Sequence, residues 1–147
     1  TNNRLGMVTA IGLTDREAVE ILSEDSSDME INVSGNTIIG NTSALDQVVD
    51  IDTENTSFMD ISFNNNTVAN MQAAGGREIV VDTENGTSNH CMDFNNNTAV
   101  DVEFDVNGTH NVEDFANFAA NNPGVTNFID GAGVTSVPNG TCQLPSF

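Results

Sequence analysis

Four carboxylates recur at a spacing that could hold a cation. The segment Val49-Asp-Ile-Asp-Thr-Glu-Asn55 is repeated thirty residues later as Ile79-Val-Val-Asp-Thr-Glu-Asn85. If the two segments lie side by side as strands, like charges come within about 5 Å of one another and repel. Oxygen ligands favour Ca²⁺ over zinc or copper, so we predict either a calcium site or an acidic face screened by salt. The residues concerned are Asp52, Glu54, Asp82 and Glu84.

These carboxylates could also be imagined to cleave a glycosidic bond, because retaining glycosidases use two carboxyl groups at a similar separation. Stacked carboxylates are, however, an automatic result of a repeat. A polysaccharide lyase would need a basic side chain beside the cation, and within the repeats only Arg77 is available. The chain has no lysine, and no Trp or Tyr on which a sugar could stack. We therefore predict that the protein is not an enzyme.

Two cysteines and two histidines are the other reactive side chains. Cys91 and Cys142 could form one disulfide in an oxidising compartment, or they could remain two unpaired, buried thiols. A bridge closing about fifty residues is expected to contribute roughly 4 kcal/mol. His90 adjoins Cys91, but neighbouring strand residues point to opposite faces, which disfavours a Cys–His nucleophile pair. We expect His90 to be exposed or to lie at a sheet edge.

The charge balance excludes several classes of partner. The chain has 22 acidic residues against three arginines, a formal net charge of −19. A nucleic-acid-binding protein needs a basic surface, and an anionic membrane would repel this chain. No segment approaches the roughly 18 apolar residues of a membrane span. Because such a polyanion suits salty or calcium-rich surroundings, we expect an extracellular or cell-surface location, without nucleic-acid binding or membrane insertion.

An internal repeat of about thirty residues must position these side chains. Met29-Glu-Ile-Asn-Val-Ser-Gly-Asn-Thr37 matches Met59-Asp-Ile-Ser-Phe-Asn-Asn-Asn-Thr67, and both match His90-Cys-Met-Asp-Phe-Asn-Asn-Asn-Thr98. Apolar residues alternate within each copy, which is typical of strands. The pattern predicts an all-β fold, a right-handed parallel β-helix (β-solenoid) with one repeat per coil. A sandwich of antiparallel hairpins would not produce a thirty-residue register.

Equivalent residues of successive coils should stack about 4.8 Å apart. Four apolar columns would then form the core. They are Val19, Val49 and Ile79; Ile21, Ile51 and Val81; Ile31, Ile61 and Met92; and Val33, Phe63 and Phe94. Asn36, Asn66 and Asn97 would form an asparagine ladder at a corner, because each amide group both donates and accepts hydrogen bonds.

We expect residues 1–147 to form a single domain in three parts. Residues 1–15 include a plausible strand, Met7–Ile11, which could lodge against a neighbouring subunit. Residues 16–109 form the repeat coils. At their start, Thr14-Asp-Arg-Glu17 has the form of a helical capping box, but the repeat favours a strand over a helix there.

Residues 110–147 are expected to form a C-terminal cap. Asn111–Pro123 changes to a helical period, which predicts a short helix that covers the last coil. The residues on its apolar face would be Val112, Phe115, Phe118 and Ala119. Final strands would follow within Val125–Val137, and a bridge from Cys142 to Cys91 would fasten the cap.

The repeats resemble those of secreted bacterial parallel β-helix proteins, the adhesin-like and surface-anchored group. Ile31-Asn-Val-Ser-Gly-Asn-Thr37 and Asp50-Ile-Asp-Thr-Glu54 carry the likeness, which covers residues 16–145. Cys91 and Gly140-Thr-Cys142 are similar to the cysteine and the closing segment in that group's last coils. The resemblance implies a parallel β-helix and export, whereas the architecture itself hosts adhesins, lyases and ice binders.

Two function classes are compatible with these observations. The first is an extracellular structural or adhesive module, whose subunits stack head to tail into a surface fibre or bind a cell-surface or matrix component. A capped C-terminal end beside an N-terminal end without a visible terminator favours it. The second is a calcium-dependent protein that binds carbohydrate or cleaves polysaccharide. Ca²⁺ is the one cofactor that the sequence suggests.

Overall fold

The structure is a computed structural model that describes residues 17–40, 47–71, 77–129 and 131–142. The predicted Met7–Ile11 strand lies outside these residues. In the described part of the chain no helix is long and apolar enough to cross a membrane.

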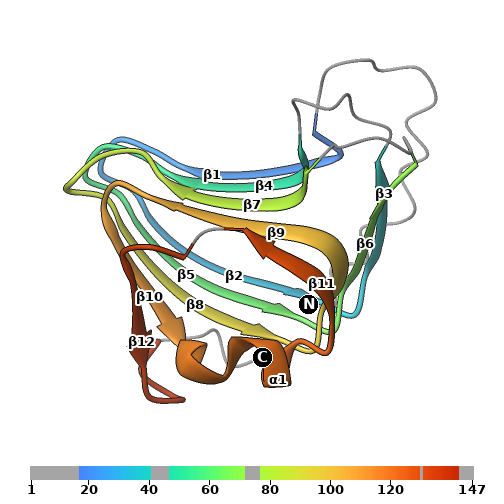
Figure 1. Cartoon of the computed structure of the whole chain (residues 1–147). Helices are drawn as coiled ribbons and strands as arrows, with labels where there is room; N and C mark the ends of the chain where they lie inside the picture. The colour runs from blue at the N-terminus through green and yellow to red at the C-terminus, as the bar shows by residue number, and fades with distance from the viewer. Residues whose placement is uncertain (1–16, 41–46, 72–76, 130, 143–147) are drawn as a thin grey trace.

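Three successive coils make a column of parallel strands, which confirms the predicted β-solenoid. Each coil contributes one strand to each of three faces of the column (Figure 1). The strands of the first coil are β1 (Val19–Ser23), β2 (Asp28–Ser34) and β3 (Thr37–Gly40). Those of the second coil are β4 (Gln47–Thr53), β5 (Phe58–Asn64) and β6 (Thr67–Asn70). Those of the third coil are β7 (Arg77–Thr83), β8 (Asn89–Asn95) and the start of β9 (Thr98–Val106).

The start of the column is a strand, as the repeat indicated, and not a helix. Val19 of β1 lies opposite Val49 of β4, and Ile21 lies opposite Ile51. Residues 14–16 of the predicted capping box lie outside the described residues. The apolar residues after it pair with the next coil, where hydrogen bonds to the neighbouring strand outweigh helical propensity.

The four apolar columns run through the interior in the predicted register. Val33, Phe63 and Phe94 lie opposite one another on β2, β5 and β8, and the rings of Phe63 and Phe94 stack with centroids 5.5 Å apart. The same strands align Ile31, Ile61 and Met92. On the other main face, β1, β4 and β7 align Val19, Val49 and Ile79, and Ile21, Ile51 and Val81. These columns supply most of the buried apolar surface that stabilises the fold.

An asparagine ladder runs along one corner. The Oδ1 atom of Asn66 accepts hydrogen bonds from the backbone N and the Nδ2 of Asn36, each at 3.0 Å. Asn97 Oδ1 accepts the same two bonds from Asn66. The ladder has a further rung that the sequence did not predict, since Asn122 Oδ1 accepts both bonds from Asn97. Each rung thus satisfies backbone groups of the preceding coil at a turn that would otherwise bury unpaired groups.

The period shortens after the third coil. β9 is long enough to pair with β6 at its start, through Thr98 and Thr67, and with β7 further on, through Val102 and Ile79. The excursion that joins β6 to β7 in the previous coil is thus missing here. The strand ends before Asn107-Gly108, a residue pair typical of turns.

The cap differs from its prediction. Residues predicted to begin a helix form β10 (Thr109–Glu113), which pairs with β8, so Val112 faces the interior opposite Met92. The helical part is shorter, a 3₁₀ turn at Phe115–Asn117 followed by α1 (Phe118–Asn121).

The physical reason is that β8 offers an edge with which the residues of β10 can pair as a strand. In addition, Asp114 adopts a left-handed conformation (φ 49°) that separates strand from helix. Ala119, predicted to be on the apolar face, is exposed.

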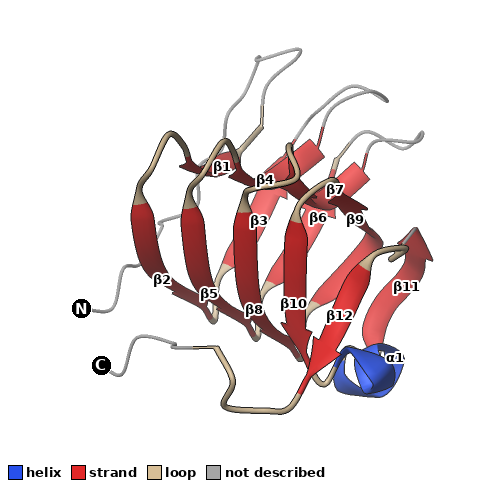
Figure 2. Cartoon of the chain, turned by 90° about the vertical axis from the view of Figure 1, so that its left-hand side faces the viewer, coloured by secondary structure: helices blue, strands red, loops and turns tan. Residues whose placement is uncertain are grey.

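Two final strands complete the cap, as expected. β11 (Gly124–Ile129) pairs with β9, and β12 (Val134–Val137) pairs with β10. Figure 2 shows β2, β5, β8, β10 and β12 side by side in one sheet, with α1 at the β12 end of the column.

Candidate functional site

The acidic row lies on the outer side of β4, β7 and β9. Asp52 pairs in register with Asp82, which pairs in turn with Asp105. Their side chains point outward because the neighbouring residues, among them Thr53 and Thr83, are fully buried. Asp105 is a member that sequence reasoning missed, since the excursion missing within β9 breaks the thirty-residue register that led to the others.

Three carboxylates come close enough to share a cation. Oxygens of Asp52, Asp82 and Glu84 all lie within 4.8 Å of one another. Glu54, the fourth predicted ligand, does not join this group, so its part in the site stays a prediction. It follows β4 at the position that Glu84 occupies after β7.

Two carboxyl groups of this row, those of Asp52 and Asp82, have raised pKa values. Burial, followed by the charges of Glu84 and Asp82, raises the pKa of Asp52 to about 7. Burial, followed by the charge of Asp105, raises the pKa of Asp82 to about 6. One oxygen of each group is buried without a hydrogen-bond partner among the described residues. A cation placed between them would relieve both the repulsion and the lost solvation.

Arg77 is engaged elsewhere. Its Nε atom lies 2.8 Å from Glu103 Oε2 on β9. Since Arg77 and Asp82 are five residues apart on the same strand, they are separated by roughly 16 Å at about 3.3 Å per residue. Arg77 is therefore not placed to act as the base beside the acidic trio that a lyase would require.

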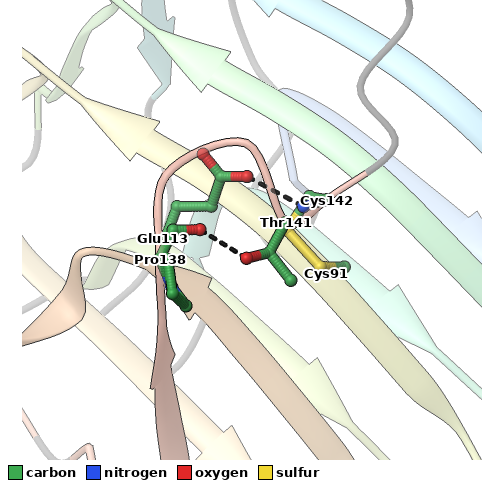
Figure 3. The surroundings of a disulfide bond; sticks show 5 residues. All are labelled: Cys91, Glu113, Pro138, Thr141 and Cys142. Carbon is green, nitrogen blue, oxygen red and sulfur yellow. Dashed lines mark hydrogen bonds between the residues drawn. A yellow bond between two sulfur atoms is a disulfide. The ribbon is translucent and has the colours of Figure 1, made fainter.

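The structure joins Cys91 and Cys142 in a disulfide, with Cα atoms 5.4 Å apart (Figure 3). Cys91 lies on the outer side of β8, and both cysteines are buried. The backbone N of Cys142 donates to Glu113 Oε1 at 2.8 Å, which holds the end of the cap against β10. The bond fastens the cap to the third coil.

His90 is not exposed, and the expectation for it was wrong. It faces the interior of β8, on the side opposite Cys91, and it is fully buried. Its ring stacks on that of His110, with centroids 4.8 Å apart and planes at 15°. The repeat itself held the signal, because His90 occupies the position of the buried Met59 in the previous coil.

The C-terminal end of the column is uncharged. Residues 115–142 include one acidic residue, Asp130, and no basic residue. Within the described part of the chain, β11 is paired only with β9, and four of its six residues are exposed. Phe128 and Ile129 on this strand are each 41% exposed. Edge strands usually carry charges that prevent pairing with another chain, and this edge carries none.

The first described coil is less buried than the coil that follows it. Met29 and Ile31 of the first coil are only partly buried, whereas their equivalents Met59 and Ile61 are fully buried in the second coil. Among the described strands, none pairs with the outer edge of β1 or β2. This coil is also acidic, because residues 17–34 contain six acidic side chains and no basic one.

These features define the chain as a short parallel β-solenoid with a disulfide-fastened cap and an acidic row on one flank. Comparison with family models, with curated proteins and with solved structures found no match for it.

Proposed function

We propose that this chain is a non-enzymatic, extracellular structural module that stacks head to tail on further copies of itself into a surface fibre. The role is that of the adhesin-like β-helix group, whose repeats it resembles. The observation that carries the proposal is the uncharged edge formed by β11 and β12, with its exposed apolar residues, to which no further strand of the described residues pairs.

The charge distribution favours the end of the column as the contact. With a net charge of −19, most surfaces of two copies repel each other. The C-terminal end lacks that repulsion, so the acidic first coil of a second copy can approach it. Burying Phe128 and Ile129 would remove exposed apolar area from water.

The geometry of the two ends is compatible with continued pairing. β1 and β2 are joined by a four-residue corner, 24–27, and β11 and β12 are joined by a corner of the same length, 130–133. A second copy could therefore lay β1 on β11 and β2 on β12 in parallel register. Such a contact is heterologous and does not close, so it would extend into a filament.

We expect the variant Ile129→Glu to prevent stacking. The new carboxylate would be buried against the acidic first coil of the next copy, so the concentration needed for assembly should rise by at least about tenfold. Light scattering and electron microscopy across a concentration series would measure it.

Met71→Glu is the matched control, because Met71 is likewise an exposed apolar residue (72%) but follows β6 on the flank of the column. It adds the same charge and should leave assembly unchanged. A wild-type chain that stays monomeric at every concentration, salt level and calcium level would contradict the proposal.

The acidic trio favours a second function, a calcium-dependent one. Asp52, Asp82 and Glu84 could hold Ca²⁺ on the flank of the column, and an acidic glycan could complete its coordination. The protein would then bind carbohydrate through the metal, or cleave polysaccharide with its help. The same site is also compatible with a purely structural calcium ion in the fibre.

We expect Ca²⁺ to raise the melting temperature at about pH 8 and to do so much less at about pH 5. Because the pKa values of Asp52 and Asp82 are raised to about 7 and 6, their contribution to stability is present at low pH and lost as the pH rises through these values. Calcium at a hundred times its Kd would add about 2.7 kcal/mol at the higher pH, or roughly 5 °C or more.

Circular dichroism melts with calcium and with EDTA would measure the shift. Asp82→Asn should abolish it, whereas Asp28→Asn, which removes an exposed carboxylate of β2 outside the trio, should keep it. Identical melts with and without calcium at pH 8 would remove the metal site.

A further inference from the structure

One interior column changes its chemistry near the C-terminal end. The residues that lie opposite one another at this position are Met29, Met59, His90, His110 and Val134. Three strands thus fill the position with an apolar side chain, and two neighbouring strands, β8 and β10, fill it with imidazole. Because the first coils show that methionine fits here, the histidines are not required by the shape of the core.

The two imidazole rings are sealed from water and almost without polar partners. His90 is 0% exposed and His110 is 1% exposed. Thr53 Oγ1 lies 3.3 Å from His90 Nδ1. His90 Nε2 and both ring nitrogens of His110 have no hydrogen-bond partner within the described parts of the chain. The ring of Phe104 packs edge-on against His110, with centroids 5.1 Å apart.

No charged group faces the stack from the strands around it. The inward residues of these strands are Thr53 of β4, Met59 of β5, Phe104 of β9 and Val134 of β12. The carboxylates on these strands and on β8 and β10 are Asp50, Asp52, Asp60, Asp93, Asp101, Glu103, Asp105 and Glu113. Strand alternation places all of them on the outer side of the column. An imidazolium formed in the stack would therefore lack a counter-ion and would face a second ring that can also take up a proton.

We propose that the His90–His110 stack is an acid-sensitive latch, which keeps the cap closed on the third coil at neutral pH and releases it when the rings take up protons. The released part is the cap from β10 onward, tethered by the Cys91–Cys142 bond. The latch concerns the stability of the cap, so it does not depend on whether the chain forms fibres.

The direction of the effect follows from where the protons bind. Burial lowers the pKa of His110 to about 3, and burial together with the neighbouring ring lowers the pKa of His90. In an opened cap both rings return toward an ordinary pKa of about 6.5. The open state thus binds more protons, and the closed state loses stability as the pH falls below about 6.5.

Hydrogen exchange followed by mass spectrometry tests the latch on the full, oxidised chain. Between about pH 7.5 and pH 4.5, and after correction for intrinsic exchange rates, we expect the opening of 109–137 to increase by roughly 100-fold for each histidine released. The β5 segment 58–64 should change far less. In the variant His90→Met/His110→Met, which copies the first two coils, this acid dependence should disappear.

The same loss of protection in the double variant, or no selective loss in the wild type, would overturn the proposal. Should the double variant fail to fold, His110→Gln provides a smaller change that removes one titrating ring. An NMR titration of the wild-type imidazoles gives an independent check. Rings that titrate near pH 6.5 while the cap stays protected would also overturn it.

Discussion

Replacing Asn97 by alanine is expected to lower the free energy of unfolding by about 4 kcal/mol. The side chain is buried and makes four hydrogen bonds with neighbouring coils. Its Oδ1 atom accepts from the backbone N and Nδ2 of Asn66, and its Nδ2 donates to the Phe63 carbonyl and to Asn122 Oδ1. Alanine would leave these partners buried, and each unsatisfied group costs about 1–3 kcal/mol before the corner relaxes.

Urea denaturation followed by circular dichroism would measure this loss. Asn127→Ala is a suitable control, because Asn127 is exposed and makes one side-chain bond, to Asp101 Oδ1 at 2.9 Å. Its effect should stay within about 0.5 kcal/mol. Equal losses in the two variants would mean that the ladder adds nothing beyond an ordinary surface amide, and the stacked corner would then need another explanation.

The repeat made the first three coils predictable. Once Val33, Phe63 and Phe94 were aligned by their spacing, one register placed every other column, because a one-residue slip would turn all side chains to the opposite face. The ladder of Asn36, Asn66 and Asn97 followed from the same register. Because the period is constant, the register of one coil fixes the register of the next, so a few aligned residues were sufficient to predict all three coils.

The cap was less predictable because its period is not constant. Asn122 follows Asn97 by 25 residues rather than 31, because the excursion found between β6 and β7 is missing within β9 and the helical turn before Asn122 adds back only part of the loss. A signal was nevertheless present, since Asn121-Asn122 repeats the doublets Asn65-Asn66 and Asn96-Asn97 at the corner before the next strand. The residue types at this corner are thus kept in the cap, although the number of residues between successive corners changes.

His90 shows where reasoning from residue type misleads. Its polarity suggested an exposed position, yet its register partner Met59 is fully buried. In a solenoid the column position decides burial more reliably than the side chain does, because the backbone of the coil is held by its neighbours on both sides. A polar residue in an apolar column is then an observation that requires a chemical explanation, which the latch provides.

A weaker contact between two rings and a stronger covalent bond hold the cap, and they lie on different sides of the sheet. The His90–His110 stack lies inside the column, and the Cys91–Cys142 bond lies on its outer side. Protonation would act on the first without breaking the second. The bond therefore keeps an opened cap close to its site, and the cap can close again when the pH rises.

Removing the disulfide should consequently cost more than any single contact in the cap. For Cys91→Ala/Cys142→Ala we expect the free energy of unfolding to fall by about 4 kcal/mol, because the bond closes a sequence separation of 51 residues and restricts the unfolded chain accordingly. Urea denaturation would measure the loss. Hydrogen exchange should increase first in β12, which Cys142 follows, while β5 remains protected.

Thr141→Ala tests whether the tether or the local packing matters. Thr141 adjoins Cys142, and among the described residues its exposed hydroxyl donates to the Pro138 carbonyl, at 2.5 Å (Figure 3). Its removal leaves the covalent bond intact, so the stability should change by less than about 0.5 kcal/mol. If instead the threonine variant lost as much stability as the cysteine pair, the strength of the cap would reside in the final turn itself, and the chain-entropy account of the bridge would be wrong.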